Sequence, residues 1–123
     1  MNITLNIGLN VSNNYMPKGE EAMTLTYKYV KDYLHRRFGT PIWMGVVQSV
    51  TEETIVVQYK SAEPVLSKLY RIAQDLKQDC IAYTIQDDDG NVLGGALVGK
   101  YAHEWNYGVF REEYCIPISE AYA

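Results

Sequence analysis

The chain has 123 residues and a formal net charge of −4, with 47% of its residues apolar and 21% charged. These values are typical of a globular protein with one hydrophobic core, so we expect residues 1–123 to form a single domain. The acidic balance disfavours long DNA or RNA as a partner, because affinity for nucleic acid comes largely from Lys and Arg on phosphate.

The sequence also indicates a compartment. No apolar run approaches the 18 residues of a membrane-spanning helix, and the N-terminus lacks the basic and apolar regions of a secretory signal. The two cysteines, Cys80 and Cys115, lie in apolar runs and are too few for a disulfide framework. We therefore expect a cytoplasmic protein with no membrane partner.

The first third of the chain predicts a strand, a loop and a helix. Apolar residues alternate with polar or small ones over residues 2–9, which is typical of a half-buried strand. Residues 10–19 are rich in Asn, Ser, Pro and Gly and predict a loop. From residue 20 to about residue 38, apolar side chains recur at helical spacing between acidic and basic ends, so we expect one long helix.

Two strands and a second helix are expected next. Residues 42–50 and 54–59 favour strands, joined by a short hairpin. A Ser-Ala-Glu-Pro start follows, which predicts a helix over about residues 61–77 with its apolar residues on one face.

The remainder predicts a second hairpin and an irregular tail. Strands over residues 80–85 and 92–98 flank Asp-Asp-Gly-Asn at 88–91, which favours a tight turn. Residues 99–123 are rich in aromatic side chains, and 116–118 favour a short edge strand.

This order of elements predicts the fold class. It is the ferredoxin-like order β-α-β-β-α-β plus an extra strand. We expect an α+β fold, with an antiparallel sheet of about five strands and two helices on one face. The other face and the edges of such a sheet are often covered by a second subunit, so we expect a homo-oligomer, a dimer or higher.

The candidate motifs for catalysis and metal binding each lack a required residue or spacing. His103-Glu104 begins like a zinc-protease helix, but Tyr107 occupies the place of the second histidine ligand. The acids at 87–89 are consecutive, whereas calcium loops place them at alternate positions. We expect no catalytic residue, no metal and no cofactor, and therefore a protein that works by binding.

The segment with the most binding chemistry is residues 99–114. Its candidate ligand-binding residues are Lys100, Tyr101, His103, Trp105, Asn106, Phe110 and Arg111. They offer rings for stacking, an amide for a base edge and cations for phosphate, as a nucleotide pocket requires. The simpler interpretation is that Trp105 and Phe110 cap the core. Tyr15 and Lys18, in the loop after the first strand, are within reach of the same ligand.

Short segments resemble a known family. Asn6-Ile7-Gly8-Leu9-Asn10 and Gly94-Gly95-Ala96-Leu97-Val98-Gly99-Lys100-Tyr101, followed by Trp105 and Phe110, resemble the first Thoeris anti-defence family of phage-encoded proteins. Members of this family are oligomeric sponges, which sequester cyclic ADP-ribose signals of TIR-domain proteins without cleaving them. The resemblance implies a counter-defence protein of the host-cell cytoplasm that binds a small cyclic nucleotide.

Within that hypothesis, specific roles are expected. Trp105 or Tyr83 stacks on adenine, and Arg111 and Lys100 hold phosphates, with Arg71 as a further candidate.

Two alternatives remain open. One is a protein-binding inhibitor, such as an anti-CRISPR, that uses the acidic surface of Glu52, Glu53 and residues 87–89. The other is a small enzyme of unrecognised type, because a catalytic triad is assembled in space and not in sequence.

Overall fold

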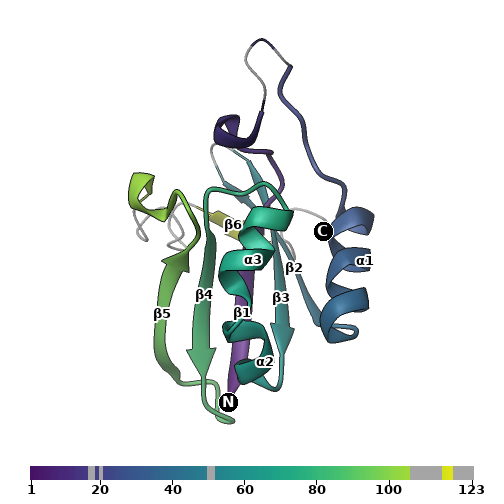
Figure 1. Ribbon diagram of the computed structural model, residues 1–123. Coiled ribbons are helices and arrows are strands. Elements are labelled where there is room, and N and C mark those ends of the chain that lie inside the picture. The colour runs from purple at the N-terminus through teal and green to yellow at the C-terminus, as the bar shows by residue number, and fades with distance from the viewer. Residues whose placement is uncertain (17–18, 20, 50–51, 106–114, 118–123) are drawn as a thin grey trace.

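The computed structural model describes residues 1–16, 19, 21–49, 52–105 and 115–117. It shows an α+β protein in which helices cover one face of an open antiparallel sheet (Figure 1). No helix in these ranges is long and apolar enough to cross a membrane.

The sheet has six strands in the order β5-β4-β1-β3-β2-β6, and each neighbouring pair is antiparallel. The strands are β1 (Asn2–Gly8), β2 (Ile42–Ser49), β3 (Glu53–Tyr59), β4 (Ile81–Gln86), β5 (Val92–Val98) and β6 (Cys115–Pro117). The five long strands end within one residue of the expected positions, and the turn between β4 and β5 is confirmed. The short edge strand is β6, although residue 118 lies outside the described part of the chain.

The core lies between β1 and the helices. Ile3, Leu5 and Ile7 of β1 have no exposed surface, and their alternation puts them on one face of the sheet. Val30 of α1 (Tyr27–Phe38) and Ile72 of α3 (Leu69–Asp75) belong to the same buried cluster. Both helical segments therefore pack on the same face, as expected.

Helix α1 is shorter than predicted. Residues 21–26 are not helical, and instead Leu25 donates a backbone hydrogen bond of 2.7 Å to the carbonyl of Leu9. Thr26 begins the helix, because its side chain accepts the otherwise unpaired N–H of Tyr29. The prediction of helix from residue 20 was wrong over residues 21–26. Helical spacing of apolar residues does not reveal that a segment pairs, in an extended conformation, with another part of the chain.

The second helix is divided. It consists of α2 (Ala62–Leu66) and α3, separated where the N–H of Lys68 donates to the carbonyl of Val65 at 3.0 Å. This bond spans three residues, so the turn is tighter than an α-helix. Most of the expected apolar face is buried in spite of the break. The buried residues are Val65, Leu69, Ile72, Ala73 and Leu76, whereas Leu66, which was expected on the same face, is 40% exposed.

Candidate functional site

Five of the ten predicted ligand-binding residues lie in or beside one region, where the loop after β1 meets the segment after β5. Tyr15 comes from the short 3-10 helix η1 (Asn13–Tyr15). The others lie in or next to the 3-10 helix η2 (Ala102–Glu104). They are Lys100, Tyr101, His103 and Trp105.

The carboxylate of Asp79 organises this region. One oxygen accepts hydrogen bonds from the Ser12 hydroxyl and, at 2.9 Å, from the Asn14 amide. The other accepts the indole N–H of Trp105 at 2.6 Å. We call the assembly the Asp79 cluster. It comprises Ser12, Asn14, Tyr15, Asp79, Tyr101, His103, Glu104 and Trp105.

Backbone contacts bring the two segments of the Asp79 cluster together. The N–H of Tyr101 donates to the carbonyl of Asp79 at 3.1 Å, and the N–H of Ser12 donates to the carbonyl of Lys77 at 2.9 Å. Gly99 allows the approach, because a Cβ there would lie 2.3 Å from the carbonyl oxygen of Asp79. The turn after α3 is therefore the common support of both segments.

Aromatic rings fill the inside of the Asp79 cluster. The rings of Tyr15 and Tyr101 pack edge to face, with centroids 5.5 Å apart. The hydroxyl of Tyr15 is buried and has no hydrogen-bond partner among the described residues. Burial raises the pKa of Tyr15, and the charges of Tyr101, Tyr70 and Asp79 add to the shift. This hydroxyl is thus a neutral donor with unused capacity.

Asp79 stays ionised despite its partial burial. Burial opposes ionisation, but hydrogen bonds from Ser12, Asn14 and Trp105, with the charge of His103, hold the pKa of Asp79 below its ordinary value. Glu104 accepts hydrogen bonds from the Asn14 amide at 3.2 and 3.4 Å. The acids of the cluster are therefore bound mainly by neutral donors.

Asp79 itself was missed at the sequence level. It lies between a helix and a strand in Gln78-Asp79-Cys80, and no motif marks it. The one available signal was the joint occurrence of Ser12 and Asn14, two polar side chains of the loop that suit a carboxylate partner.

The other predicted residues lie elsewhere. Tyr83 is on the helix-covered face of β4 and packs against the core, and Arg71 on α3 forms an ion pair of 2.9 Å with Asp75. Asn106, Phe110 and Arg111 lie outside the described residues, as does Lys18. The structure thus separates Tyr83 and Arg71 from the contacts of the Asp79 cluster.

Two described side chains that could act in catalysis, those of His35 and Cys80, are hydrogen-bonded or protonated. His35 forms a 2.7 Å hydrogen bond with the Thr40 hydroxyl. Burial raises the pKa of the Cys80 thiol to about 11, with the charges of Asp79 and Glu52 contributing, so at neutral pH it is a poor nucleophile. Within the described ranges no three His, Cys, Asp or Glu side chains are grouped to hold a metal ion.

Comparisons with known proteins give no family for the chain. No protein-family model matches the sequence, no curated protein matches it, and no solved structure matches the fold.

Proposed function

We propose that the protein binds a small nucleotide at the Asp79 cluster without altering it chemically. Trp105 carries the proposal: its side chain is 42% exposed, yet its N–H is fixed by Asp79 at 2.6 Å. An exposed ring that is already immobilised loses little entropy when a base stacks on it.

Neighbouring groups support a phosphorylated ligand. Lys100 is an exposed cation and His103 an exposed imidazole on the same segment as Trp105. Among the described residues the buried hydroxyl of Tyr15 has no hydrogen-bond partner, which costs about 1–3 kcal/mol, and a polar group of the ligand that reached it would remove that cost.

Sequestration is the form of binding that we propose. The resemblance to the first Thoeris anti-defence family implies a cyclic ADP-ribose signal, held intact in the cytoplasm of an infected cell. The hydrogen bond of His35 and the raised pKa of the Cys80 thiol support binding without cleavage.

Tryptophan fluorescence tests the site. In Trp43→Phe, emission comes from Trp105 alone, and titration with cyclic ADP-ribose or 3′,5′-cyclic AMP should quench it. In Trp105→Phe, the remaining Trp43 lies on β2 beneath the Lys31 ammonium, 3.9 Å from its ring centre, and should not respond. Loss of the ring in Trp105→Ala should weaken binding by about tenfold or more.

Recovery of the ligand tests the chemistry. After incubation and heat denaturation, we expect the nucleotide to return unchanged. A converted product would indicate an enzyme, and unaltered affinity in Trp105→Ala would remove the Asp79 cluster from the binding site.

The acidic-surface alternative has weaker support. Glu52 accepts the N–H of Asn10 at 2.9 Å, and Glu53 accepts the Tyr27 hydroxyl at 2.5 Å. Asp87 is occupied by its own turn, where it accepts the N–H groups of residues 89 and 91, each at 2.9 Å. Acids committed to local structure are poorly placed to mimic the phosphates of a nucleic acid.

We also propose a ferredoxin-like core that assembles into a homo-oligomer through β5. The strand order β4-β1-β3-β2, with a helical segment after β1 and another after β3, supports this core. β5 ends the described sheet, carries no charged residue, and exposes Val92 and Leu93 by 66% and 57%. Such an edge favours pairing with a second copy. Leu93→Lys should reduce the mass measured by light scattering, and a monomeric parent protein would contradict the proposal.

A further inference from the structure

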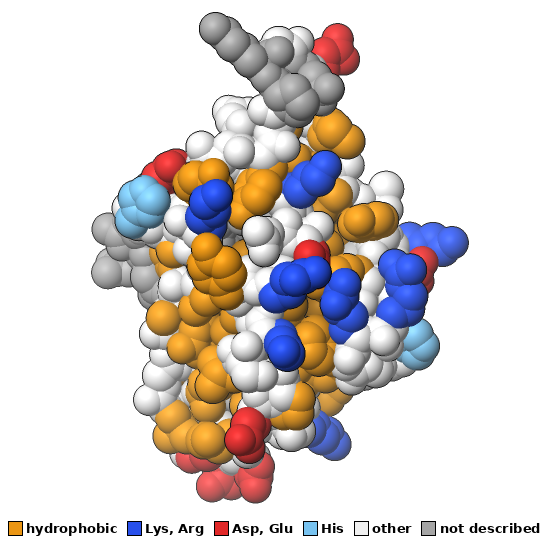
Figure 2. All heavy atoms as spheres, in the orientation of Figure 1, with side chains coloured by type: hydrophobic (Ala, Val, Ile, Leu, Met, Phe, Trp, Pro, Cys, Tyr) orange, Lys and Arg blue, Asp and Glu red, His pale blue; other side chains and the backbone are white. Residues whose placement is uncertain are grey.

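A second region of the surface has the opposite electrostatic character. Seven of the eleven Lys and Arg fall within residues 27–38 and 67–77, against two acids, although the whole chain is acidic. Figure 2 shows these basic side chains gathered over the helices, whereas the acids of the β4–β5 turn lie at the lower end of the molecule. Negative ligands are therefore attracted to the helical face.

Within that face, α1 and α3 border a hollow with a volume of about 420 Å³. We call it the arginine hollow. Its lining residues are Tyr29, Tyr33, Arg36, Arg37 and Asp75. The volume falls in the range of about 300–1,000 Å³ that is typical of small-molecule sites.

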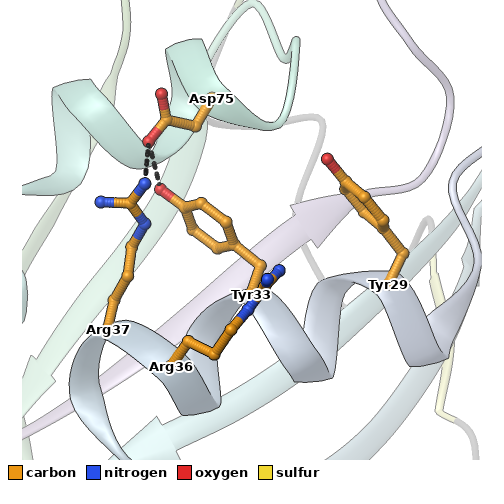
Figure 3. Close-up of a pocket in the computed structure, with 5 residues that line it drawn as sticks. All are labelled: Tyr29, Tyr33, Arg36, Arg37 and Asp75. Carbon is orange, nitrogen blue, oxygen red and sulfur yellow. Dashed lines mark hydrogen bonds and ion pairs between the residues drawn. The ribbon is translucent and has the colours of Figure 1, made fainter.

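Asp75 holds the arginine hollow in shape. Its carboxylate accepts the Tyr33 hydroxyl at 2.6 Å and pairs with Arg37 at 3.4 Å (Figure 3). It also pairs with Arg71 at 2.9 Å. The guanidinium of Arg37 lies over the Tyr33 ring, 4.7 Å from its centre. These contacts restrain the guanidinium of Arg37 before any ligand arrives.

Charge remains uncompensated in the arginine hollow. Its lining carries two guanidinium groups, from Arg36 and Arg37, against the single carboxylate of Asp75, and Arg71 pairs with the same carboxylate from outside the lining. Burial opposes ionisation of Asp75, but its hydrogen bonds and the two paired arginines hold its pKa below the ordinary value. Burial and the bond to Asp75 raise the pKa of Tyr33, so its hydroxyl stays a neutral donor.

Arg36 is the group most available to a ligand. Its Nε donates to the backbone carbonyl of Asp32 at 3.2 Å, and within the described residues it forms no ion pair. Tyr29, two turns away on α1, is 49% exposed and presents a ring at the rim. An exposed guanidinium and an exposed ring on the same helix suit a phosphate attached to a flat group.

We propose that the arginine hollow is a binding site for the phosphate groups of a small phosphorylated molecule. This site is separate from the Asp79 cluster and does not depend on the nucleotide proposed there. The guanidinium groups of its lining outnumber its carboxylate, and they supply donors that a phosphate accepts more fully than a single carboxylate does.

Calorimetry with pyrophosphate, ADP and adenosine tests the proposal on the full chain. We expect pyrophosphate and ADP to bind, and adenosine to bind at least tenfold more weakly than ADP. Arg36→Gln should weaken both phosphorylated ligands at least tenfold. Lys28→Gln, the same charge change elsewhere on α1, should alter affinity less than twofold. Equal effects of the two variants would show diffuse attraction and overturn the site, as would no binding at millimolar concentration.

Two further variants sharpen the result. Asp75→Asn removes the competing carboxylate and should tighten pyrophosphate binding, whereas weaker binding in a variant that melts like the parent protein would overturn the role of Asp75 as counter-ion. Tyr29→Ala should weaken ADP but not pyrophosphate. Trp105→Ala should leave the affinity for pyrophosphate unchanged, because pyrophosphate has no base to stack on Trp105, so failure of this site and failure of the Asp79 cluster are distinguishable.

Discussion

The Asp79 cluster and the arginine hollow treat a carboxylate in opposite ways, although their central acids are four residues apart. Asp79 is bound by neutral donors, from Ser12, Asn14 and Trp105. Asp75 is bound by two arginines and a tyrosine hydroxyl. The first arrangement ties chain segments together, and the second restrains cations that outnumber their counter-ion.

The two acids therefore have different roles in the two regions, one structural and one related to ligand binding. In the Asp79 cluster the acid is needed to hold an exposed ring in place. In the arginine hollow the acid competes with any anionic ligand. Removing the acid should therefore harm the first region and favour binding in the second.

The largest effect is expected from a core substitution that weakens the support of both regions. Ile72 of α3 has no exposed surface and belongs to the core, three residues before Asp75 and seven before Asp79. Ile72→Ala should lower the free energy of unfolding by about 2–5 kcal/mol, through lost transfer energy and a cavity. Urea unfolding measures this loss. A loss below 1 kcal/mol would show that α3 is not packed on the core.

The next largest effect is confined to the Asp79 cluster. Gly99→Ala places a Cβ 2.3 Å from the carbonyl oxygen of Asp79 and 2.7 Å from Cα of Cys80. Because both atoms belong to the backbone, relief requires chain movement, and we expect a loss of about 1–3 kcal/mol. Gly94→Ala is the matched control, since its Cβ would meet nothing within 4 Å. Thermal melts that agree for the two variants would contradict the close approach.

Asp79→Ala should lower the free energy of unfolding by less than Gly99→Ala does. We expect a loss near the lower end of the range of about 1–3 kcal/mol for unpaired donors, because the donors that lose Asp79 are partly open to water. The emission maximum of Trp105, read in the Trp43→Phe background, should shift as the indole N–H loses its acceptor. An unchanged spectrum would mean that Asp79 does not fix the ring.

The same carboxylate predicts a dependence on pH. The pKa of Asp79 in the folded protein lies below the unfolded value of about 3.9, so the unfolded chain takes up the proton first as pH falls. Stability from this group is complete above that value and declines as pH drops through it. Asp79→Asn should flatten the decline between pH 5 and 3, measured by urea midpoints. Asp75 shifts in the same direction, so its asparagine variant is the comparison.

The smallest effect belongs to the rim of the arginine hollow. The Arg71 side chain is 65% exposed, so its ion pair with Asp75 is screened by water. Arg71→Ala should change stability by less than about 1 kcal/mol. A larger loss in urea unfolding would show that the pair is structural, and would weaken the contrast with the Asp79 cluster.

Periodicity located β1 well because its apolar residues lie on the face of the sheet that packs against the helices. The alternation of Ile3, Leu5 and Ile7 persists in the sheet, and the β4–β5 turn forms around Gly90, whose φ is +86°. The helix boundaries were less accurate, since the segment before Thr26 pairs with the chain after β1 and the turn at Lys68 interrupts the second helix. Those choices depend on contacts that are distant in sequence or specific to one turn.

The candidate sites divide in the same way. Aromatic and basic residues from 100 to 105 stood out by composition, and so did Tyr15 in its loop. Nothing in the sequence marked Asp79 as their common acceptor. The arginine hollow was also hidden, because its residues are split between two helices whose basic residues look like ordinary solvated faces.

The sequence by itself determined the α+β class, the strands and the chemical character of the segment after β5, because these depend on local patterns of apolar, turn-forming and aromatic residues. The tertiary structure alone decided which charges meet. It brought the Asp79 carboxylate to the indole N–H of Trp105 and placed Asp75 between Arg37 and Arg71, since hydrogen bonds and ion pairs depend on distance in space.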